Sequence, residues 1–183
     1  MLLAFIFAVF SGPRHALDAQ QSKPEEYQVK AVYLFNFGKF IEWPQATPKD
    51  NLFGVCVLGH DPFGATLDAT INGEIIEGKK LVARRIAGIQ DAANCRILFI
   101  SMSEANHVKQ ILASVERTGV LTVSDMPDFT SSGGMIQFIL RENKVRFEVN
   151  LSAAEKAGLT FSSQLLKVAT TVKRDEQKGV EGQ

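Results

Sequence analysis

Three short polar segments, each following an apolar run, hold the residue types that could bind a small polar or anionic molecule. They offer hydroxyl groups, a carboxylate and the N-terminus of an expected helix, all of which can meet a polar ligand. Because the carboxyl ends of parallel strands meet at one edge of an α/β sheet, we expect the three segments to lie close together. The residues of this predicted ligand-binding site are Gly59, His60, Asp61, Phe63, Ser101, Ser103, Ser124 and Asp125. The alternative is that Asp61, Ser103 and Ser124 only cap helices and close turns, as such residues do at many strand ends.

The chain carries no recognisable catalytic motif. His60 and His107 are the only histidines after residue 19, and neither a GxSxG nor an HExxH sequence occurs. The segment GEIIEGKK, residues 73–80, resembles a phosphate-binding loop. However, Lys80 replaces the hydroxyl that would hold a metal ion, and two glutamates would repel phosphate. We therefore expect no enzyme activity, no metal site and no cofactor.

The charge balance of the chain argues against strongly charged partners, which bind through the electrostatic field of a basic or acidic protein. The chain has 20 basic and 20 acidic residues, so its formal net charge is zero. Residues 1–19 contain one base and one acid, so the remainder is also neutral. We do not expect such a protein to bind nucleic acid or an anionic membrane surface.

The first ten residues, MLLAFIFAVF, form an apolar run that is too short to cross a bilayer, which needs about 20 apolar residues. The run suits the hydrophobic region of a secretory signal peptide, and the small residues after it place the predicted cleavage behind Ala19. We therefore predict a signal peptide over residues 1–19, a linker over 20–25, one α/β domain over 26–172 and a flexible tail over 173–183.

Two interpretations remain open for Cys56 and Cys95, the only cysteines of the chain. In an oxidising compartment they can form one disulfide. Each can equally be a small, buried hydrophobic residue.

Residues 27–43 have the apolar periodicity of a helix, which Pro44 ends. Lys30 lies on the apolar face of this helix, and we expect it to extend its ammonium group to water from the first turn. The alternative is an ion pair with a partner carboxylate. Tyr27 and Phe35 fall outside the apolar face. Their simplest role is to pack under the C-terminal helix, and our hypothesis is that they contact a partner protein or a second copy of the chain.

Short apolar runs predict strands over residues 52–58, 80–86, 96–101, 120–123, 136–140 and 145–149. The last two are expected to pair as an antiparallel hairpin about Glu142 and Asn143. Helices are expected over residues 61–71, 103–117, 152–157 and 162–172. This order predicts an α/β fold with a mixed β-sheet of five to six strands, flanked by helices on both faces and followed by the C-terminal antiparallel hairpin.

In this order, the segments resemble the YfiR-like family, also known as the DUF4154 domain. The likeness covers nearly the whole chain after the predicted signal peptide. It rests on Tyr27-Gln28-Val29-Lys30-Ala31, Phe40-Ile41-Glu42-Trp43-Pro44, Val55-Cys56-Val57-Leu58-Gly59, Asp61-Pro62-Phe63-Gly64, Ile97-Leu98-Phe99-Ile100-Ser101, Leu121-Thr122-Val123-Ser124-Asp125, Gly133-Gly134-Met135-Ile136 and Val145-Arg146-Phe147-Glu148-Val149-Asn150.

The resemblance implies a soluble periplasmic protein that regulates by binding another protein. Its implied partner is an inner-membrane diguanylate cyclase. The periplasmic protein represses this cyclase until an outer-membrane lipoprotein sequesters the periplasmic protein. A homodimer and a disulfide between Cys56 and Cys95 are implied as well. The alternative function is a periplasmic sensor domain whose small-molecule ligand modulates a membrane partner.

Overall fold

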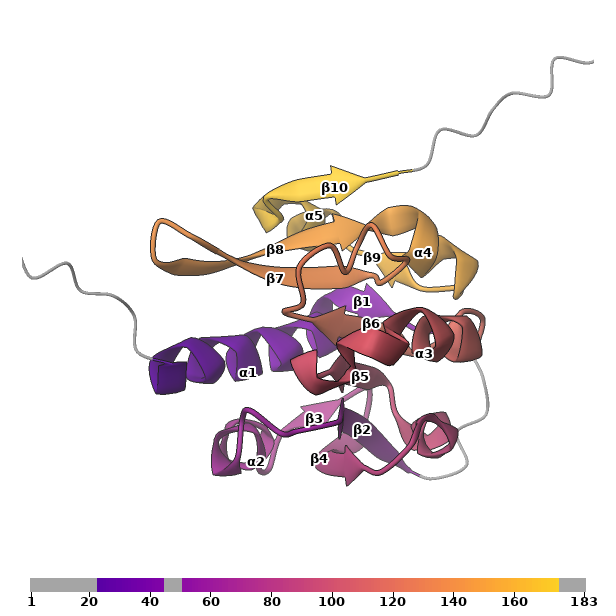
Figure 1. Cartoon of the computed structure of the whole chain (residues 1–183). Coiled ribbons are helices and arrows are strands. Elements are labelled where there is room, and N and C mark those ends of the chain that lie inside the picture. The colour runs from indigo at the N-terminus through magenta and orange to yellow at the C-terminus, as the bar shows by residue number, and fades with distance from the viewer. Residues whose placement is uncertain (1–22, 45–50, 175–183) are drawn as a thin grey trace, which may run out of the picture.

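The protein folds into a layered α/β structure, which a computed structural model describes for residues 23–44 and 51–174 (Figure 1). The predicted signal peptide, with its cleavage after Ala19, and residues 175–183 of the predicted tail lie outside the described residues. Within the described ranges, we find no helix that is both long and apolar enough to cross a membrane.

An eight-stranded mixed sheet lies at the centre of the molecule, which is more than the five to six strands predicted. Its strand order is β10-β8-β7-β6-β5-β2-β4-β3. In chain order the strands are β2 (Leu52–Leu58), β3 (Ile75–Ile76), β4 (Lys79–Ile86), β5 (Ile97–Ile100), β6 (Leu121–Ser124), β7 (Ile136–Arg141), β8 (Lys144–Asn150) and β10 (Thr171–Lys173). Strands β2, β4, β5, β6 and β7 are parallel, and β8 and β10 run opposite to β7. A separate antiparallel pair is formed by β1 (Ile41–Glu42) and β9 (Thr160–Phe161).

Helices cover both faces of this sheet, and its central strands are buried on both sides. Every residue of β5 and β6 is buried. On one face, α1 (Lys23–Phe40) and α2 (Ala65–Ile71) pack against the sheet in one hydrophobic cluster. This cluster includes Leu34 and Phe37 of α1 and Phe99 of β5. On the other face, η1 (Ile89–Asn94) and α3 (Val108–Val115) share a second cluster with Leu98 and Phe129. The expectation of helices on both faces is therefore confirmed.

Strands β7 and β8 are paired antiparallel, with Arg141 opposite Lys144. Glu142 and Asn143 link them, and both have positive φ angles, 52° and 56°. Two successive residues of this conformation make the tight turn whose twist matches that of the paired strands. The pair does not end the sheet, because β10 lies beside β8.

Two predicted helices end earlier than the sequence indicates. Helix α1 stops at Phe40, and the next two residues pair with β9 instead. In place of the helix predicted over residues 162–172, the structure has the shorter helix α5 (Ser163–Val168). Ser162 caps this helix, because its Oγ accepts a hydrogen bond from Leu165 N. The chain then turns into β10, and Thr170 N donates to the Phe147 carbonyl. The β-branched run from Thr170 to Val172 favours a strand over a helix.

Cys56 and Cys95 form a disulfide, with their Cα atoms 5.8 Å apart. Cys56 lies on β2 and Cys95 lies two residues before β5, and these two strands are neighbours in the sheet. The disulfide prediction is therefore confirmed, and the interpretation of two free buried thiols is wrong.

Candidate functional site

The predicted ligand-binding residues lie at the end of the sheet where β2, β5 and β6 finish, which we call the carboxyl edge. The chain crosses from β2 to β4 on one side, whereas β5 and β6 lie on the other side of β2. Such a switch in strand order is where α/β proteins commonly bind ligands. Here, however, a hydrogen bond joins the loop after β2 to the segment after β5: His60 N donates to Ser103 Oγ at 2.9 Å. A Cβ on Gly59 would lie 2.4 Å from the same oxygen, so the loops after β2 and β5 are in close contact.

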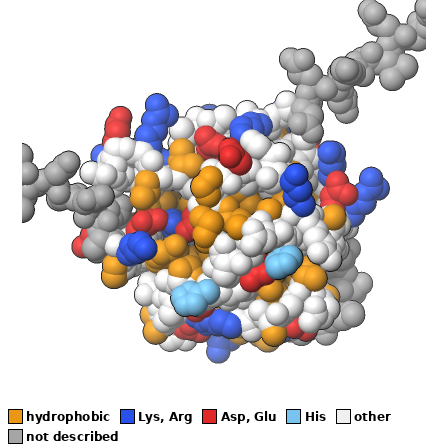
Figure 2. All heavy atoms as spheres, viewed as in Figure 1, with side chains coloured by type: hydrophobic (Ala, Val, Ile, Leu, Met, Phe, Trp, Pro, Cys, Tyr) orange, Lys and Arg blue, Asp and Glu red, His pale blue; other side chains and the backbone are white. Residues whose placement is uncertain are grey.

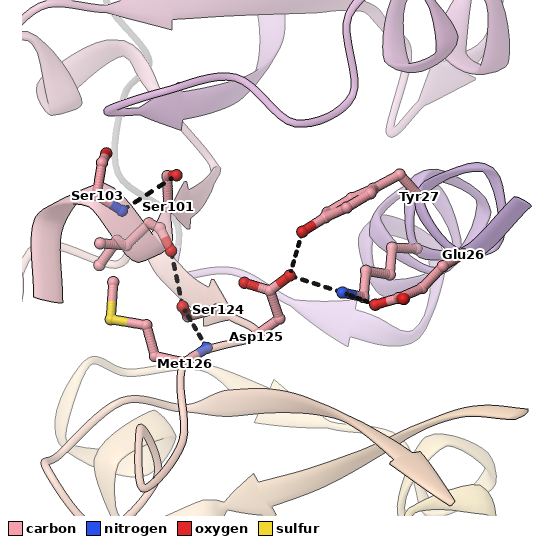
Figure 3. Close-up of polar contacts among 9 residues, drawn as sticks. Glu26, Tyr27, Ser101, Ser103, Ser124, Asp125 and Met126 are labelled. Atoms are coloured by element: carbon pink, nitrogen blue, oxygen red, sulfur yellow. Dashed lines mark hydrogen bonds and ion pairs between the residues drawn. The ribbon is translucent and has the colours of Figure 1, made fainter. Parts of the chain in front are cut away.

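Internal hydrogen bonds hold the three serines of the carboxyl edge (Figure 3). Ser101 Oγ accepts from Ser103 N at 3.5 Å. Ser124 Oγ donates to the Ile100 carbonyl at 2.7 Å and accepts from Met126 N at 3.1 Å. Ser124 is completely buried. The hydroxyl groups that the sequence assigns to a ligand thus cap a helix and join neighbouring strands.

Asp61 belongs to an ion-pair cluster centred on Arg85 of β4. Its Oδ1 accepts from Phe63 N at 2.8 Å, and its Oδ2 accepts from Arg85 Nε at 2.8 Å. Arg85 also pairs with Asp68 of α2 at 2.6 Å and donates to the Gly64 carbonyl at 2.6 Å. The hydrogen bond from Arg85 is the main cause that lowers the pKa of Asp68. These ion pairs and hydrogen bonds of Arg85 connect the loop after β2 with β4 and α2.

Lys30 reaches the carboxyl edge from α1, and only 3% of it is exposed. Its Nζ lies 2.6 Å from Asp125 Oδ2 and 2.5 Å from Glu26 Oε1 (Figure 3). The expectation that Lys30 extends to water is therefore wrong, and the alternative of an ion pair is confirmed. The physical reason is that the first turns of α1 cross the end of β6, where Asp125 begins the next loop and offers a carboxylate.

Tyr27 joins the same network. Its hydroxyl donates to Asp125 Oδ2 at 2.8 Å, and Lys30 Nζ lies 4.3 Å from the centre of its ring. The ring packs edge-on against the buried Phe63, at 5.4 Å between centroids. Burial raises the pKa of the Tyr27 hydroxyl well above its usual range, and the hydrogen bond to Asp125 raises it further. Tyr27 therefore links α1 to the loops after both β2 and β6.

Phe35, the other aromatic residue assigned to partner contact, is half-buried on α1. It packs against the core on the α1 face of the sheet, as Tyr27 does. Lys39 Nζ lies 3.9 Å from the centre of its ring, a cation–π contact.

The charges of the carboxyl edge are largely neutralised within the protein. Lys30 faces two carboxylates, those of Glu26 and Asp125, so the group carries a net charge of about −1. Within residues 23–44 and 51–174, no three His, Cys, Asp or Glu side chains are grouped so that they could hold a metal ion. A packed polar network of this kind positions α1 and does not leave a cation free for an anionic ligand.

Exposed apolar side chains lie near this network. Met102 follows β5 and is 49% exposed. Leu140 is 57% exposed, and the register of β7 against β6 places it beyond the last residue of β6. Figure 2 shows hydrophobic side chains gathered in the middle of this face, between α1 and the β7–β8 pair. Exposed apolar surface, beside polar groups that are already paired within the protein, suits contact with another protein.

Sequence reasoning did not identify Glu26 and Arg85 as part of this edge. Glu26 precedes Lys30 by four residues, a spacing that favours an ion pair on a helix, so a signal was present. Arg85 lies on β4, and nothing in the local sequence shows that its side chain meets Asp61 and Asp68.

Comparisons with known proteins agree with this fold. The family model described as DUF4154, YfiR/HmsC-like, matches residues 27–170. A solved structure of a conserved domain protein from Vibrio cholerae O1 biovar El Tor strain N16961 aligns with a TM-score of 0.54 and 12% identity, covering 80% of this chain. An ABC domain in complex with L-Trp from Streptococcus pneumonia aligns with a TM-score of 0.52 and 11% identity, covering 81% of this chain. The chain spans only 60% of the length of each of these two proteins, and at such low identity the likeness concerns the fold alone.

Proposed function

The chain belongs to the YfiR/HmsC-like family, and on this basis we propose that it binds and represses an inner-membrane signalling protein of the diguanylate cyclase type. The family supports a periplasmic regulatory role in general. The observation that carries the proposal is the family match over residues 27–170, which includes most of α1 and the loops after β2, β5 and β6. An outer-membrane lipoprotein that sequesters the protein, and a homodimer, are part of the same proposal.

The carboxyl edge is the surface that we assign to the membrane partner. Met102 and Leu140 offer exposed apolar area there. Tyr27 reaches the same edge from α1 and is half-buried, with its ring packed against Phe63 and its hydroxyl donating to Asp125. Rigid aromatic and apolar side chains of this kind lose little conformational entropy on binding and are typical of the centre of protein interfaces.

The test is capture of the partner from solubilised inner membrane, together with the cellular level of cyclic di-GMP. We expect the tagged protein to retain a membrane protein that carries a cyclase domain, and we expect deletion of the gene to raise cyclic di-GMP. Met102→Glu should weaken capture at least about tenfold, because it places a charge in an apolar contact. Ile75→Glu is the matched control, since Ile75 is 63% exposed on β3, away from the carboxyl edge.

Two results would contradict the proposal. Capture that is equal for Met102→Glu and for the unchanged protein would exclude the carboxyl edge as the interface. Absence of any cyclase among the captured proteins, with unchanged cyclic di-GMP, would exclude the partner itself.

A second candidate function is a periplasmic sensor whose small ligand alters the binding of its membrane partner. The fold likeness to a domain solved in complex with L-Trp supports it. The two candidates differ in one outcome: a sensor changes its capture of the partner when a ligand is added or removed, whereas a simple binding protein does not.

A further inference from the structure

The outer edge of β4 is open over most of its length. Strand β2 pairs with the inner edge of β4 all the way from Lys80 to Ile86. On the outer edge, β3 pairs only with Lys79 and Lys80. Both β3 and β4 lie on the side of the sheet away from β10 (Figure 1). Beyond β3, therefore, no strand of the described ranges covers the outer edge of β4.

The backbone groups of Ala83 and Arg85 point outward from this edge. Leu81 N marks the direction, because it donates to the Glu74 carbonyl, just before β3, at 3.0 Å. Alternate residues of a strand direct their N–H and C=O groups to the same side, so those of Ala83 and Arg85 point the same way. Within residues 23–44 and 51–174, no hydrogen bond joins these groups to another residue. They form a row of donors and acceptors with the spacing of a strand.

A cavity of about 430 Å³ lies between this edge and α2, and we call it the α2–β4 groove. Four successive residues of β4, Lys80 to Ala83, line it. Successive side chains point to opposite faces of a sheet, so a cavity that touches all four residues lies against the backbone edge of the strand. Because β2 covers the inner edge, the groove lies along the outer one.

The groove offers accessible apolar surface beside the row of backbone groups. Ala69 of α2 is exposed, and Val82 and Ala83 of β4 are partly exposed. Ile71 and Leu81 also line the groove, but they are buried and only close its floor. An extended chain along β4 would therefore cover small and branched apolar side chains while its backbone pairs with the strand.

The edge attracts a partner through its backbone more than through a charge. Arg85 Nε lies 2.8 Å from Asp61 Oδ2, and Arg85 Nη2 lies 2.6 Å from Asp68 Oδ2. The guanidinium of Arg85 is thus already neutralised by two carboxylates, whereas its backbone groups remain open. An extended segment needs no particular charge to bind there.

A second copy of the chain is a poor occupant of this edge. Since β3 and the bond from Leu81 close the edge up to that residue, a strand can pair only beyond it. A two-fold pairing of two β4 strands centred on Ala83 then joins only residues 82–84. Centred on Arg84 or on Arg85, it joins more residues but sets that arginine opposite the same arginine of the other copy. Like charges directly opposite each other destabilise paired strands, so a different protein fits better.

We propose that the outer edge of β4 binds an extended segment of another protein, which adds a strand to the sheet. The segment follows the line of β3 beyond Leu81 and pairs with the backbone of Ala83 and Arg85. One of its apolar side chains enters the α2–β4 groove. In such complexes the backbone hydrogen bonds give affinity, and pockets for alternate side chains give specificity. The inference does not rest on the proposed repression, which uses Met102 and Leu140.

The experiment is a titration of the ¹⁵N-labelled protein with the peptide acetyl-Thr-Val-Thr-Val-Thr-amide, followed by amide chemical shifts and hydrogen exchange. The same peptide with every amide nitrogen methylated is the matched probe, because it has no backbone donor. We expect saturable shifts centred on residues 82–86 and slower exchange of the Ala83 and Arg85 amides, which are open in the free protein. The methylated peptide should bind at least about tenfold more weakly.

Variants locate the site. Ala83→Pro removes one outward donor, and an edge strand tolerates proline where the N–H faces solvent, so the variant should fold and bind the peptide at least about tenfold more weakly. Ala69→Gln adds bulk to the groove from an exposed position of α2 and should weaken binding at least about threefold. Ala65→Gln is its control, because Ala65 is exposed on the same helix but does not line the groove. Melting temperatures show whether each variant is folded.

Several results would overturn the proposal. These are the absence of saturable shifts, equal binding of the methylated peptide, shifts confined to β10 at the other edge of the sheet, and unchanged affinity in folded Ala83→Pro and Ala69→Gln. Concentration-dependent shifts of Ala83 and Arg85 without peptide would assign the edge to a second copy of the chain instead. Met102→Glu should leave peptide binding unchanged, so failure of the proposed repression and failure of this inference are distinguishable.

Discussion

Lys30 Nζ lies 2.6 Å from Asp125 Oδ2, so one ion pair fastens the start of α1 to the loop after β6, 95 positions further along the chain. Lys30→Met should leave the carboxylates of Asp125 and Glu26 with little water and no cation. Because an uncompensated, nearly buried charge is costly, we expect the free energy of unfolding to fall by about 3 kcal/mol. Urea unfolding at pH 7 measures this loss.

Lys144→Met is the control for this change, because Lys144 is exposed, and its effect should stay within about 0.5 kcal/mol. Changing Asp125 to leucine in the Lys30→Met background should restore part of the loss, since it removes one of the orphaned carboxylates. A Lys30→Met protein as stable as the control variant would contradict the importance of the ion pair.

Tyr27 should remain protonated at alkaline pH where an ordinary tyrosine ionises. Its pKa is raised by burial and by the hydrogen bond to Asp125, so the folded protein holds this proton more tightly than the unfolded chain does. The stabilisation is therefore complete below about pH 10, the unfolded value, and is lost as the pH rises above it. In Tyr33→Phe, which leaves Tyr27 as the only tyrosine, absorbance at 295 nm should show no phenolate near pH 10. A normal titration curve would show that the Tyr27 hydroxyl is not held by Asp125.

The central strands could be predicted from the sequence because their composition is decisive. Strand β5 is a short, wholly apolar segment bounded by polar residues, a pattern typical of buried parallel strands, and the apolar Val120, Leu121 and Val123 mark β6 in a similar way. Strand β10 could not be predicted in the same way. All three of its residues are exposed, so no burial pattern marks it. Its β-branched residues favour an extended chain, and pairing with the backbone of β8 makes that chain a strand of the sheet.

The polar network shows where the prediction of the site reaches its limit. Asp61, Ser103 and Ser124 were identified from their positions after strands, and the structure does bring their segments together. Whether a polar side chain there faces a ligand or another part of the protein depends on contacts distant in sequence. Lys30 is the clearest example, because its place on an apolar face was evident, whereas its partner Asp125 is set only by the packing of α1 across the sheet.

Reduction of the Cys56–Cys95 disulfide should destabilise the protein. The two cysteines are 39 residues apart, and the chain-entropy model gives a stabilisation of about 4 kcal/mol for a loop of this length. We expect a reducing agent to lower the unfolding free energy of the protein by about this amount, measured by urea unfolding. A Cys56→Ala/Cys95→Ala variant should not respond to the reducing agent, and equal responses of the two proteins would contradict the prediction.

Arg85→Gln should destabilise the protein in a pH-dependent way. Arg85 lowers the pKa of Asp68, so its contribution is present above the unfolded pKa of about 4 and is lost as the pH falls through the lower, folded value. The difference in melting temperature between Arg85→Gln and the unchanged protein should therefore shrink in acid. Because both side chains are partly exposed, the difference at pH 7 should be modest and should decrease with added salt. A difference that is constant from pH 7 to pH 3 would show that Arg85 acts through packing.

Ser124→Ala tests whether the serines of the carboxyl edge hold the fold or a ligand. Ser124 is completely buried, and its hydroxyl bridges the Ile100 carbonyl and Met126 N. Its loss leaves a buried carbonyl and a buried N–H without this partner, so the free energy of unfolding should fall by about 1 to 2 kcal/mol. Ser103→Ala, at an exposed position of the same edge, should cost about 0.5 kcal/mol or less. If Ser124→Ala were as stable as the unchanged protein but no longer repressed its partner, Ser124 would act on a ligand or on the partner, and the structural role derived from its hydrogen bonds would be wrong.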